Sequence, residues 1–186
     1  MPGAHVSMRT SHIKVGWAHC LFVCHRCNKN KERKPVQSFE NQLIIERPRP
    51  DVFAFVADFE NMPKWNYFVI DVDNVSDEPP AVGTRFHQVR KTDQQDYQIV
   101  DLEPNERVAV ETLPPAQPLR MSFRFESVPG GTRLTDRWEF DPDVPGPLQW
   151  LAARRVKSAV SDNLEKLKQL LETGEVRLQD GRQVAL

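Results

Sequence analysis

The carboxy-terminal stretch from Leu148 to Glu172 constrains the fold more than any other segment, because it reads as one long amphipathic helix. At about 100° per residue, its apolar side chains fall on one arc and its charged side chains on the other. Pro145 and Pro147 stand where a helix can begin, and Gly174 stands where one commonly ends. Such a helix is roughly 37 Å long. Asn163 near the middle of its apolar stripe indicates that the helix faces a partly polar cavity.

The residues before this helix predict an antiparallel sheet. Alternating apolar and polar side chains indicate a first strand over 39–46. Two short helical segments follow, at 51–57 and 58–65, the second interrupted by Pro63. Six further strands are predicted at 68–75, 83–91, 97–102, 107–113, 118–128 and 132–140, and the turn-forming residues between them are few. Short connections between successive strands predict an antiparallel meander.

These elements predict the α+β class and a particular arrangement. A sheet of about seven antiparallel strands has one apolar face, and one long helix is available to cover it. A strongly curved sheet wrapped around the helix satisfies both. Curvature leaves space between the two, so the sequence predicts an internal pocket, partly closed by the two short helices.

Composition and length bound the domain organisation. With 186 residues, 39% of them hydrophobic, the chain can bury one core. We assign that core to residues 38–174 and expect a carboxy-terminal tail at 175–186. No apolar run approaches the roughly 20 residues of a membrane span, so we expect no integral membrane segment.

The first 37 residues form a basic leader. They contain seven Lys and Arg residues against one acid, whereas the rest of the chain has 18 bases against 25 acids. An acidic body argues against nucleic-acid binding, since phosphate neutralisation supplies most of that affinity. The leader lacks a sustained hydrophobic period, and we expect it to be disordered or to be translated upstream of the true start.

All three cysteines, Cys20, Cys24 and Cys27, lie in the leader with the spacing CxxxCxxC. The spacing resembles the cluster motif of radical S-adenosylmethionine enzymes, but the large barrel of those enzymes is not predicted here. A zinc site completed by His19 or His25 has plausible ligand chemistry, although zinc knuckles usually bring two separated ligand pairs together. We expect neither metal nor cofactor. An odd cysteine count without a signal peptide favours a reducing, cytoplasmic location.

Four segments of the domain together resemble the START-like helix-grip (SRPBCC) superfamily, in particular its polyketide cyclase/dehydrase-like bacterial members. The segments are 47–58 (RPRPDVFAFVAD), 62–66 (MPKWN), 82–86 (VGTRF) and 130–135 (GGTRLT). The resemblance covers about residues 39–173 and implies the helix-grip fold. It also implies a pocket that holds hydrophobic small molecules such as lipids, quinones or aromatic polyketides. Some members of the superfamily are enzymes, whereas many only bind or carry a ligand.

Candidate site residues follow from the strand periods. In the last strand Asp136 and Trp138 share a face with Leu134, and in the strand before it the corresponding face carries Met121, Phe123 and Phe125. Met and Phe side chains suit a flat apolar ligand, and they equally suit an ordinary core. A carboxyl group among apolar neighbours has a raised pKa and can act as general acid or base. The alternative for Asp136 is a structural ion pair with a residue such as Arg155.

Further residues are candidates for the wall or mouth of the predicted pocket. Asn163 can orient a ligand carbonyl or hydroxyl, or it can bond strand backbone or a buried water. Trp65 resembles the tryptophan that the superfamily places at the pocket mouth, and Tyr67 and Trp150 can join it; the alternative is a lid that packs on the core. The inward face of the strand that carries His87 is not determined by the pattern, and we expect a surface or hydrogen-bond-satisfied histidine there rather than a general base. The direction of the Tyr97 hydroxyl is undecided for the same reason.

The leading functional hypothesis is binding or transfer of a hydrophobic small molecule in this pocket. The second is a cofactor-independent cyclase, dehydratase or hydrolase in which Asp136 is the acid/base and Asn163 or a tyrosine positions the substrate. The third is a protein-interaction or regulatory domain. The sequence determines neither the ligand nor the oligomeric state.

Overall fold

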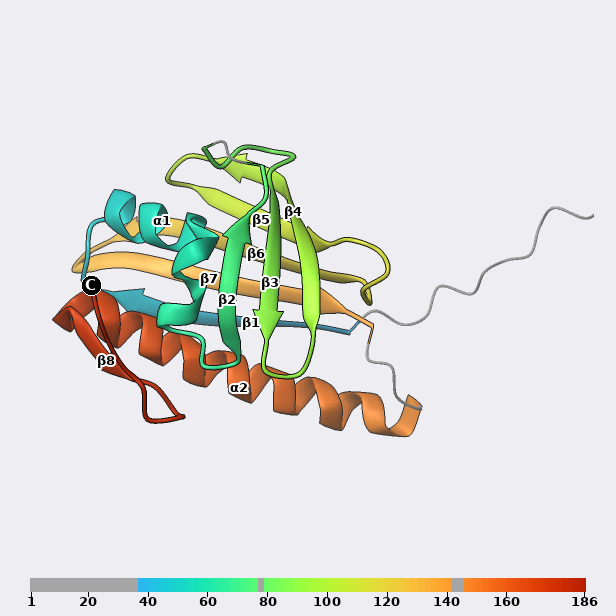
Figure 1. Cartoon of the computed structure of the whole chain (residues 1–186). Coiled ribbons are helices and arrows are strands. Elements are labelled where there is room, and N and C mark those ends of the chain that lie inside the picture. The colour runs from blue at the N-terminus through green and yellow to red at the C-terminus, as the bar shows by residue number, and fades with distance from the viewer. Residues whose placement is uncertain (1–36, 77–78, 142–145) are drawn as a thin grey trace, which may run out of the picture. The chain divides into compact units, whose positions relative to one another are not determined.

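A seven-stranded antiparallel sheet dominates the computed structural model, which describes residues 37–76, 79–141 and 146–186. The strands lie in the order β1-β7-β6-β5-β4-β3-β2 (Figure 1). Their bounds are β1 (Gln37–Ile45), β2 (Val69–Asn74), β3 (Arg85–Arg90), β4 (Gln94–Glu103), β5 (Arg107–Thr112), β6 (Leu119–Val128) and β7 (Gly131–Phe140). Strands β2 to β7 form a meander, and β1 pairs with β7 along its whole length. The predicted antiparallel sheet is confirmed.

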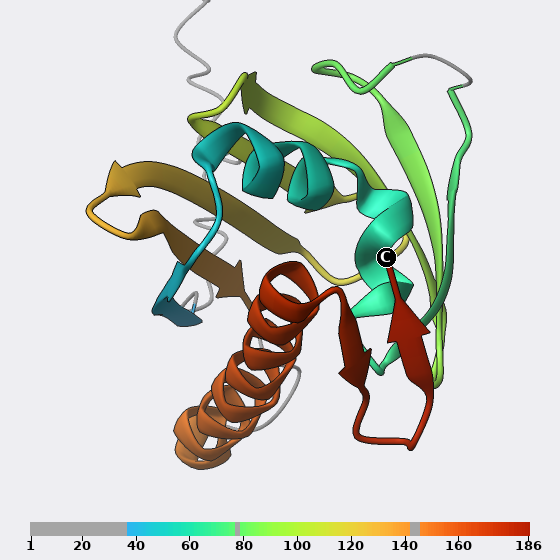
Figure 2. The same ribbon diagram turned by 90° about the vertical axis from the view of Figure 1, so that its left-hand side faces the viewer.

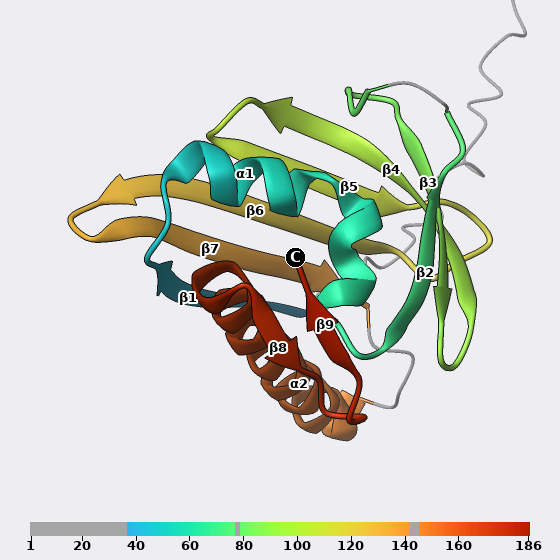
Figure 3. The same ribbon diagram turned by 60° about the vertical axis from the view of Figure 1, so that its left-hand side comes forward.

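Three helices lie on one side of this sheet (Figures 2 and 3). They are α1 (Arg49–Ala57), the 3₁₀-helix η1 (Phe59–Lys64) and the long α2 (Gly146–Thr173). Helix α2 packs along β1, α1 packs on β6 and β7, and η1 packs on β2. The sheet bends around them, so that β1 and β2 run in very different directions (Figure 3). This is the helix-grip arrangement that the sequence predicts.

Local sequence explains where the helices begin and end. Pro48 and Pro50 start α1, where a missing N–H costs little, and Asp51 lies in its first turn. The Asp58 carboxylate caps η1 by accepting a hydrogen bond from the Glu60 amide at 3.2 Å. Gly174 follows α2 with a φ of 82°, a conformation that glycine adopts without strain. The predicted end of the long helix is confirmed.

The core lies between the helices and the concave face of the sheet. Along β7, Thr132, Leu134 and Asp136 are buried, whereas the residues between them are at least partly exposed. Helix α2 contributes its apolar stripe, with Leu164, Leu167, Leu170 and Leu171 all buried. Gly131 allows the β6–β7 turn to approach β1, because a Cβ there would stand 2.1 Å from the Ile45 carbonyl oxygen.

The last residues form an ordered hairpin where the sequence analysis expected a tail. Strands β8 (Glu175–Arg177) and β9 (Gln183–Ala185) pair antiparallel. Val176 and Leu178 are buried in the same hydrophobic core as the sheet and α2. The Asp180 carboxylate accepts from the Lys91 ammonium group at 2.9 Å. The burial of these two apolar side chains explains why the segment is ordered. Its strands are too short to be recognised from the sequence pattern.

Candidate functional site

A cavity of about 370 Å³ lies between α2 and the concave face of the sheet. Its walls come from η1 and the turn after it, from β2 to β4, from β6 and β7, and from the middle of α2. Most of the wall is apolar: Met62, Trp65, Met121, Phe123, Val156 and Leu164 are among its members. The sequence thus predicts the position of the cavity, between a curved sheet and the one helix that crosses it.

Asp136 is fully buried and lies in the cavity wall. Its carboxyl group has no cation within ion-pair distance among the described residues; instead the indole N–H of Trp138 donates to it, at 2.9 and 3.0 Å from the two oxygens. Burial raises its pKa from 3.8 to about 7, and the Trp138 hydrogen bond opposes the rise. Asp136 therefore titrates near neutral pH, unlike an exposed carboxylate.

Strand β1, which pairs with β7, places a second polar side chain, Asn41, beside Asp136. Asn41 lies directly opposite Asp136 in the β1–β7 register. Its buried amide nitrogen makes no hydrogen bond of good geometry within the described part of the chain, yet its approach to the carboxyl group also lowers the pKa of Asp136. The ion pair between Asp136 and Arg155 that the sequence analysis considered is not formed here. Arg155 is exposed at the cavity rim.

Asn163 lines the cavity and is 3% exposed. Its amide nitrogen donates to the Asn66 side-chain oxygen at 3.0 Å, and its oxygen accepts from the Gln179 amide at 3.2 Å. The side chain thus ties α2 to the turn after η1 and to the C-terminal hairpin. Its partners are thus side chains of the protein, whereas the sequence analysis considered a ligand, strand backbone or a buried water.

The remaining predicted residues divide into two groups. Trp65, Met121, Phe123 and Trp138 all line the cavity together with Asp136 and Asn163. Tyr67 and Phe125 do not. Phe125 packs edge-on against Phe53 in the core, with ring centroids 5.3 Å apart. Tyr67 packs against Phe68 with its ring tilted by 37°, and the Lys91 ammonium group lies 4.9 Å from the Tyr67 ring centroid.

Strand β3 supplies a polar wall residue that the sequence analysis missed. Gln88 is buried and donates a hydrogen bond to the Met62 sulfur at 3.0 Å. Its neighbour His87 points the other way and bonds Asp96 at 2.7 Å, so the expected surface position of His87 is confirmed. The sequence signal that could have identified Gln88 is its spacing of two from Phe86, because alternate residues of a strand share one face, here the concave one.

Strand β4 contributes Tyr97, which is buried in the cavity wall. Its hydroxyl donates to the Gln95 side-chain oxygen at 2.8 Å. Burial raises the pKa of Tyr97 to about 12. The phenol therefore stays protonated at neutral pH and can act in the cavity only as a neutral hydrogen-bonding group.

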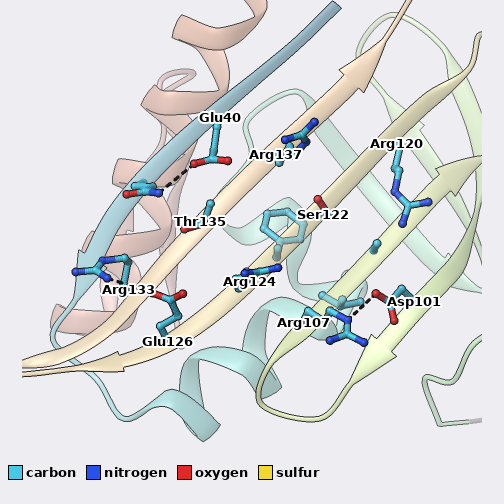
Figure 4. Close-up of a pocket in the computed structure, with 14 residues that line it drawn as sticks. Glu40, Asp101, Arg107, Arg120, Ser122, Arg124, Glu126, Arg133, Thr135 and Arg137 are labelled. Carbon is cyan, nitrogen blue, oxygen red and sulfur yellow. Dashed lines mark hydrogen bonds and ion pairs between the residues drawn. The ribbon is translucent and has the colours of Figure 1, made fainter. Parts of the chain in front are cut away.

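A second hollow, of about 450 Å³, lies on the convex face of the same sheet (Figure 4). Five arginines line it, namely Arg107, Arg120, Arg124, Arg133 and Arg137. Four of them pair with neighbouring carboxylates, for example Arg107 with Asp101 at 2.7 Å and Arg133 with Glu126 at 3.1 Å. The charges of this hollow largely balance within the protein, so we place the candidate site in the concave cavity.

Comparison with known proteins decides the family. A family model described as polyketide cyclase / dehydrase and lipid transport matches residues 36–172. The chain belongs to that family. No curated protein sequence matches this family member.

Solved structures share the fold of this family member. Protein MLL2253 from Mesorhizobium loti is 22% identical, with a TM-score of 0.60 over 75% of this chain and 100% of its own. The di-domain ARO/CYC StfQ from the steffimycin biosynthetic pathway is 20% identical, with a TM-score of 0.60 over 75% of this chain and 52% of its own. The Aha1 dimer from Colwellia psychrerythraea is 19% identical, with a TM-score of 0.57 over 74% of this chain and 98% of its own. At these identities the likeness shows the fold alone.

Two further observations concern the membrane and metals. Among the described residues, no helix is both long and apolar enough to cross a membrane. Those residues also contain no group of three or more His, Cys, Asp or Glu side chains placed to hold a metal ion. The basic leader up to residue 36, with its three cysteines, lies outside the described residues.

Proposed function

We propose that this protein binds and carries a hydrophobic small molecule of the lipid, quinone or aromatic polyketide type. The observation that carries the proposal is the cavity of about 370 Å³ whose wall is mainly apolar and aromatic. Its volume falls within the roughly 300–1,000 Å³ of ligand pockets. Trp65, Phe123 and Trp138 offer flat apolar surface, which suits a ring system or an acyl chain.

The polar groups of the wall fit a ligand with few hydrogen-bonding groups. Asn163, Gln88 and Tyr97 already have protein partners. Asp136 has two carboxyl oxygens, which accept from the indole of Trp138 and are approached by the Asn41 amide without a hydrogen bond of good geometry. A carboxyl oxygen can accept more than one hydrogen bond. A ligand hydroxyl or phenol placed beside Asp136 would therefore find an acceptor in an otherwise apolar space.

Native mass spectrometry of the protein purified from its own host tests this proposal. We expect a co-purifying compound that is released on denaturation. Ala159 lines the cavity, so the Ala159→Phe variant should lose the compound by filling the space that it occupies. Its exposed neighbour gives the matched control Ser158→Phe, which should retain it. A wild-type protein that remains empty under all growth conditions would contradict the proposal.

A second function, cofactor-independent acid/base catalysis on such a ligand, is favoured by one observation. Asp136 lies in the cavity wall with a pKa of about 7, where a single group can both accept and release a proton at neutral pH. For this function Asp136→Asn should abolish turnover of the co-purifying compound and preserve its binding. Unchanged turnover in that variant would reject Asp136 as the catalytic group.

A further inference from the structure

The first turns of α2 present three large apolar side chains to solvent. Leu148 is 53% exposed, Trp150 61% and Leu151 36%, whereas Leu164, Leu167 and Leu170 of the same helix are buried. These first turns extend beyond the ends of β1 and β7, so the sheet does not cover them (Figure 1). We call Leu148, Trp150 and Leu151 the overhang patch.

The two leucines of the overhang patch lie near the edge of the α2 face that lines the cavity, whereas Trp150 lies on the outer side of the helix. Residues three, four and seven apart share one side of a helix. Leu148 and Leu151 therefore lie in line with Arg155 and Ala159, which both belong to the cavity wall. Leu151 stands one turn before Arg155, so a surface that covers Leu151 also approaches Arg155 at the edge of the cavity wall.

The first turns of α2 themselves carry only positive charge, between Asp141 and Asp143 before them and Asp162 after them in the sequence. Residues 146–161 contain Arg154, Arg155 and Lys157 and no acid. All three cations are exposed, and within the described part of the chain none of them forms an ion pair. Most other arginines near the sheet, by contrast, pair with a carboxylate. Exposed aromatic and leucine side chains flanked by unpaired cations match the chemistry of an anionic lipid surface, which offers phosphates outside and acyl chains beneath.

The same charges argue against the main alternative occupant. If a second copy of this chain covered the patch symmetrically, Arg154, Arg155 and Lys157 of both copies would face one another. Like charges brought together in an interface oppose association. An anionic membrane instead supplies the opposite charge along with the apolar environment.

We propose that the first turns of α2 dock on the surface of an anionic lipid membrane. Trp150 and the two leucines enter the boundary between headgroups and acyl chains, and the three cations contact lipid phosphates. Docking brings Arg155, at the edge of the cavity wall, close to the bilayer. The proposal goes beyond ligand binding itself, and either can fail without the other.

Flotation of the full chain with lipid vesicles tests the docking. We expect binding to vesicles of equal phosphatidylcholine and phosphatidylglycerol, weak binding to phosphatidylcholine alone, and a loss of binding as salt rises. Trp150→Ser with Leu151→Ser should weaken the partition coefficient at least about tenfold, because apolar area no longer leaves water. Arg154→Gln with Lys157→Gln should weaken it by about fivefold per cation. The basic leader is the same in every variant, so differences report the patch.

Matched controls come from apolar side chains that are equally exposed elsewhere. Val82 is 64% exposed and Leu186 is 61% exposed, and Leu186 ends the chain at the opposite end of α2 from the patch (Figure 1). Their replacement by Ser should leave vesicle binding unchanged. Wild-type binding by the Trp150/Leu151 variant, or absence of wild-type binding to anionic vesicles, would overturn the proposal. So would a dimer, measured by sedimentation, that the Trp150/Leu151 substitutions dissociate. Ligand retention, measured by native mass spectrometry on the same variants, separates this failure from that of the cavity.

Discussion

The two faces of the sheet carry hollows of similar size, one lined by many charged side chains and the other mainly by apolar side chains. On the convex face, about 450 Å³ is lined by five arginines, four of which pair with nearby carboxylates (Figure 4). On the concave face, about 370 Å³ is lined mainly by apolar side chains and holds a single buried carboxyl group, Asp136, without a cation. Both faces come from the same strands, since alternate residues of β6 and β7 point to opposite sides.

This difference shows where a charge has large consequences. Exposed ion pairs are screened by solvent and each contributes about 0–1 kcal/mol. A buried carboxyl group without a cation instead loses hydration that nothing fully replaces, and its pKa rises to about 7. The many charges of the convex face therefore stabilise little, whereas the single one of the concave face couples stability, pH and any ligand in the cavity.

Adjacent residues of β6 give the largest expected contrast. Phe125 is buried and packs on Phe53, whereas Arg124 on the other face is exposed. Phe125→Ala should lower the free energy of unfolding by about 3–5 kcal/mol, through lost burial and a residual cavity. Arg124→Ala should change it by less than about 0.5 kcal/mol. Urea denaturation measures both, and equal losses would contradict the assignment of the two faces.

Asp136→Asn should remove a pH dependence of stability. The pKa of Asp136 is about 7 in the folded chain and 3.8 in the reference state, so the folded state binds more protons between these values. Stability should therefore fall as pH rises from 3.8 to 7 and then stay level. Between pH 5 and 8 the wild type should lose about 3 kcal/mol relative to Asp136→Asn, at about 1.4 kcal/mol per pH unit.

Urea denaturation of the two proteins at pH 5 and pH 8 checks this difference. Glu126→Gln on the convex face is the matched control, because Glu126 is exposed and paired with Arg133. That variant should stay within about 1 kcal/mol of the wild type at either pH. Parallel pH profiles for the wild type and Asp136→Asn would show that Asp136 is not perturbed.

Trp138→Phe should act through the same carboxyl group with a smaller effect. The indole N–H bonds favour the carboxylate form, and their removal should raise the pKa of Asp136 further. We expect a loss of about 2 kcal/mol at pH 8, typical of a hydrogen bond to a charged group. At pH 5, where Asp136 is protonated, the loss should be smaller. Denaturation at the two pH values measures it, and an equal loss at both would attribute the effect to packing alone.

The smallest effect is expected on the convex face. Arg120 and Glu111 pair across β5 and β6, with 39% and 45% of their side chains exposed. A double-mutant cycle with Arg120→Gln and Glu111→Gln should give a coupling energy below about 1 kcal/mol, and added salt should reduce it. A coupling energy above 2 kcal/mol would mean that the convex hollow is less solvated than its exposure indicates.

Periodicity explains how much of the fold could be predicted. Strands with one buried face alternate apolar and polar residues, and the long helix repeats its apolar side chains with the helical period, so both are visible in the sequence. The C-terminal hairpin was missed because strands of three residues are too short to show a period. Its order depends on Val176 and Leu178 entering a core built by distant segments.

The site was predictable where burial follows from a strand period and not where it depends on long-range partners. Asp136 was found because Leu134 and Trp138 flank it on one face. The partners of Asn163 lie 97 and 16 residues away in sequence, at Asn66 and Gln179, and no local pattern pairs them. Gln88 was missed because glutamine side chains are usually exposed, whereas here the buried amide donates a hydrogen bond to the Met62 sulfur.

Titration with the neutral fluorescent probe N-phenyl-1-naphthylamine tests the central claim, that the concave cavity holds an apolar ligand. We expect saturable binding with enhanced emission for the wild type and for Ser158→Phe, whose substitution lies outside the cavity. Ala159→Phe, which fills the cavity, should bind at least about tenfold more weakly, because the probe can no longer leave water there. Equal binding by Ala159→Phe and Ser158→Phe would contradict the account.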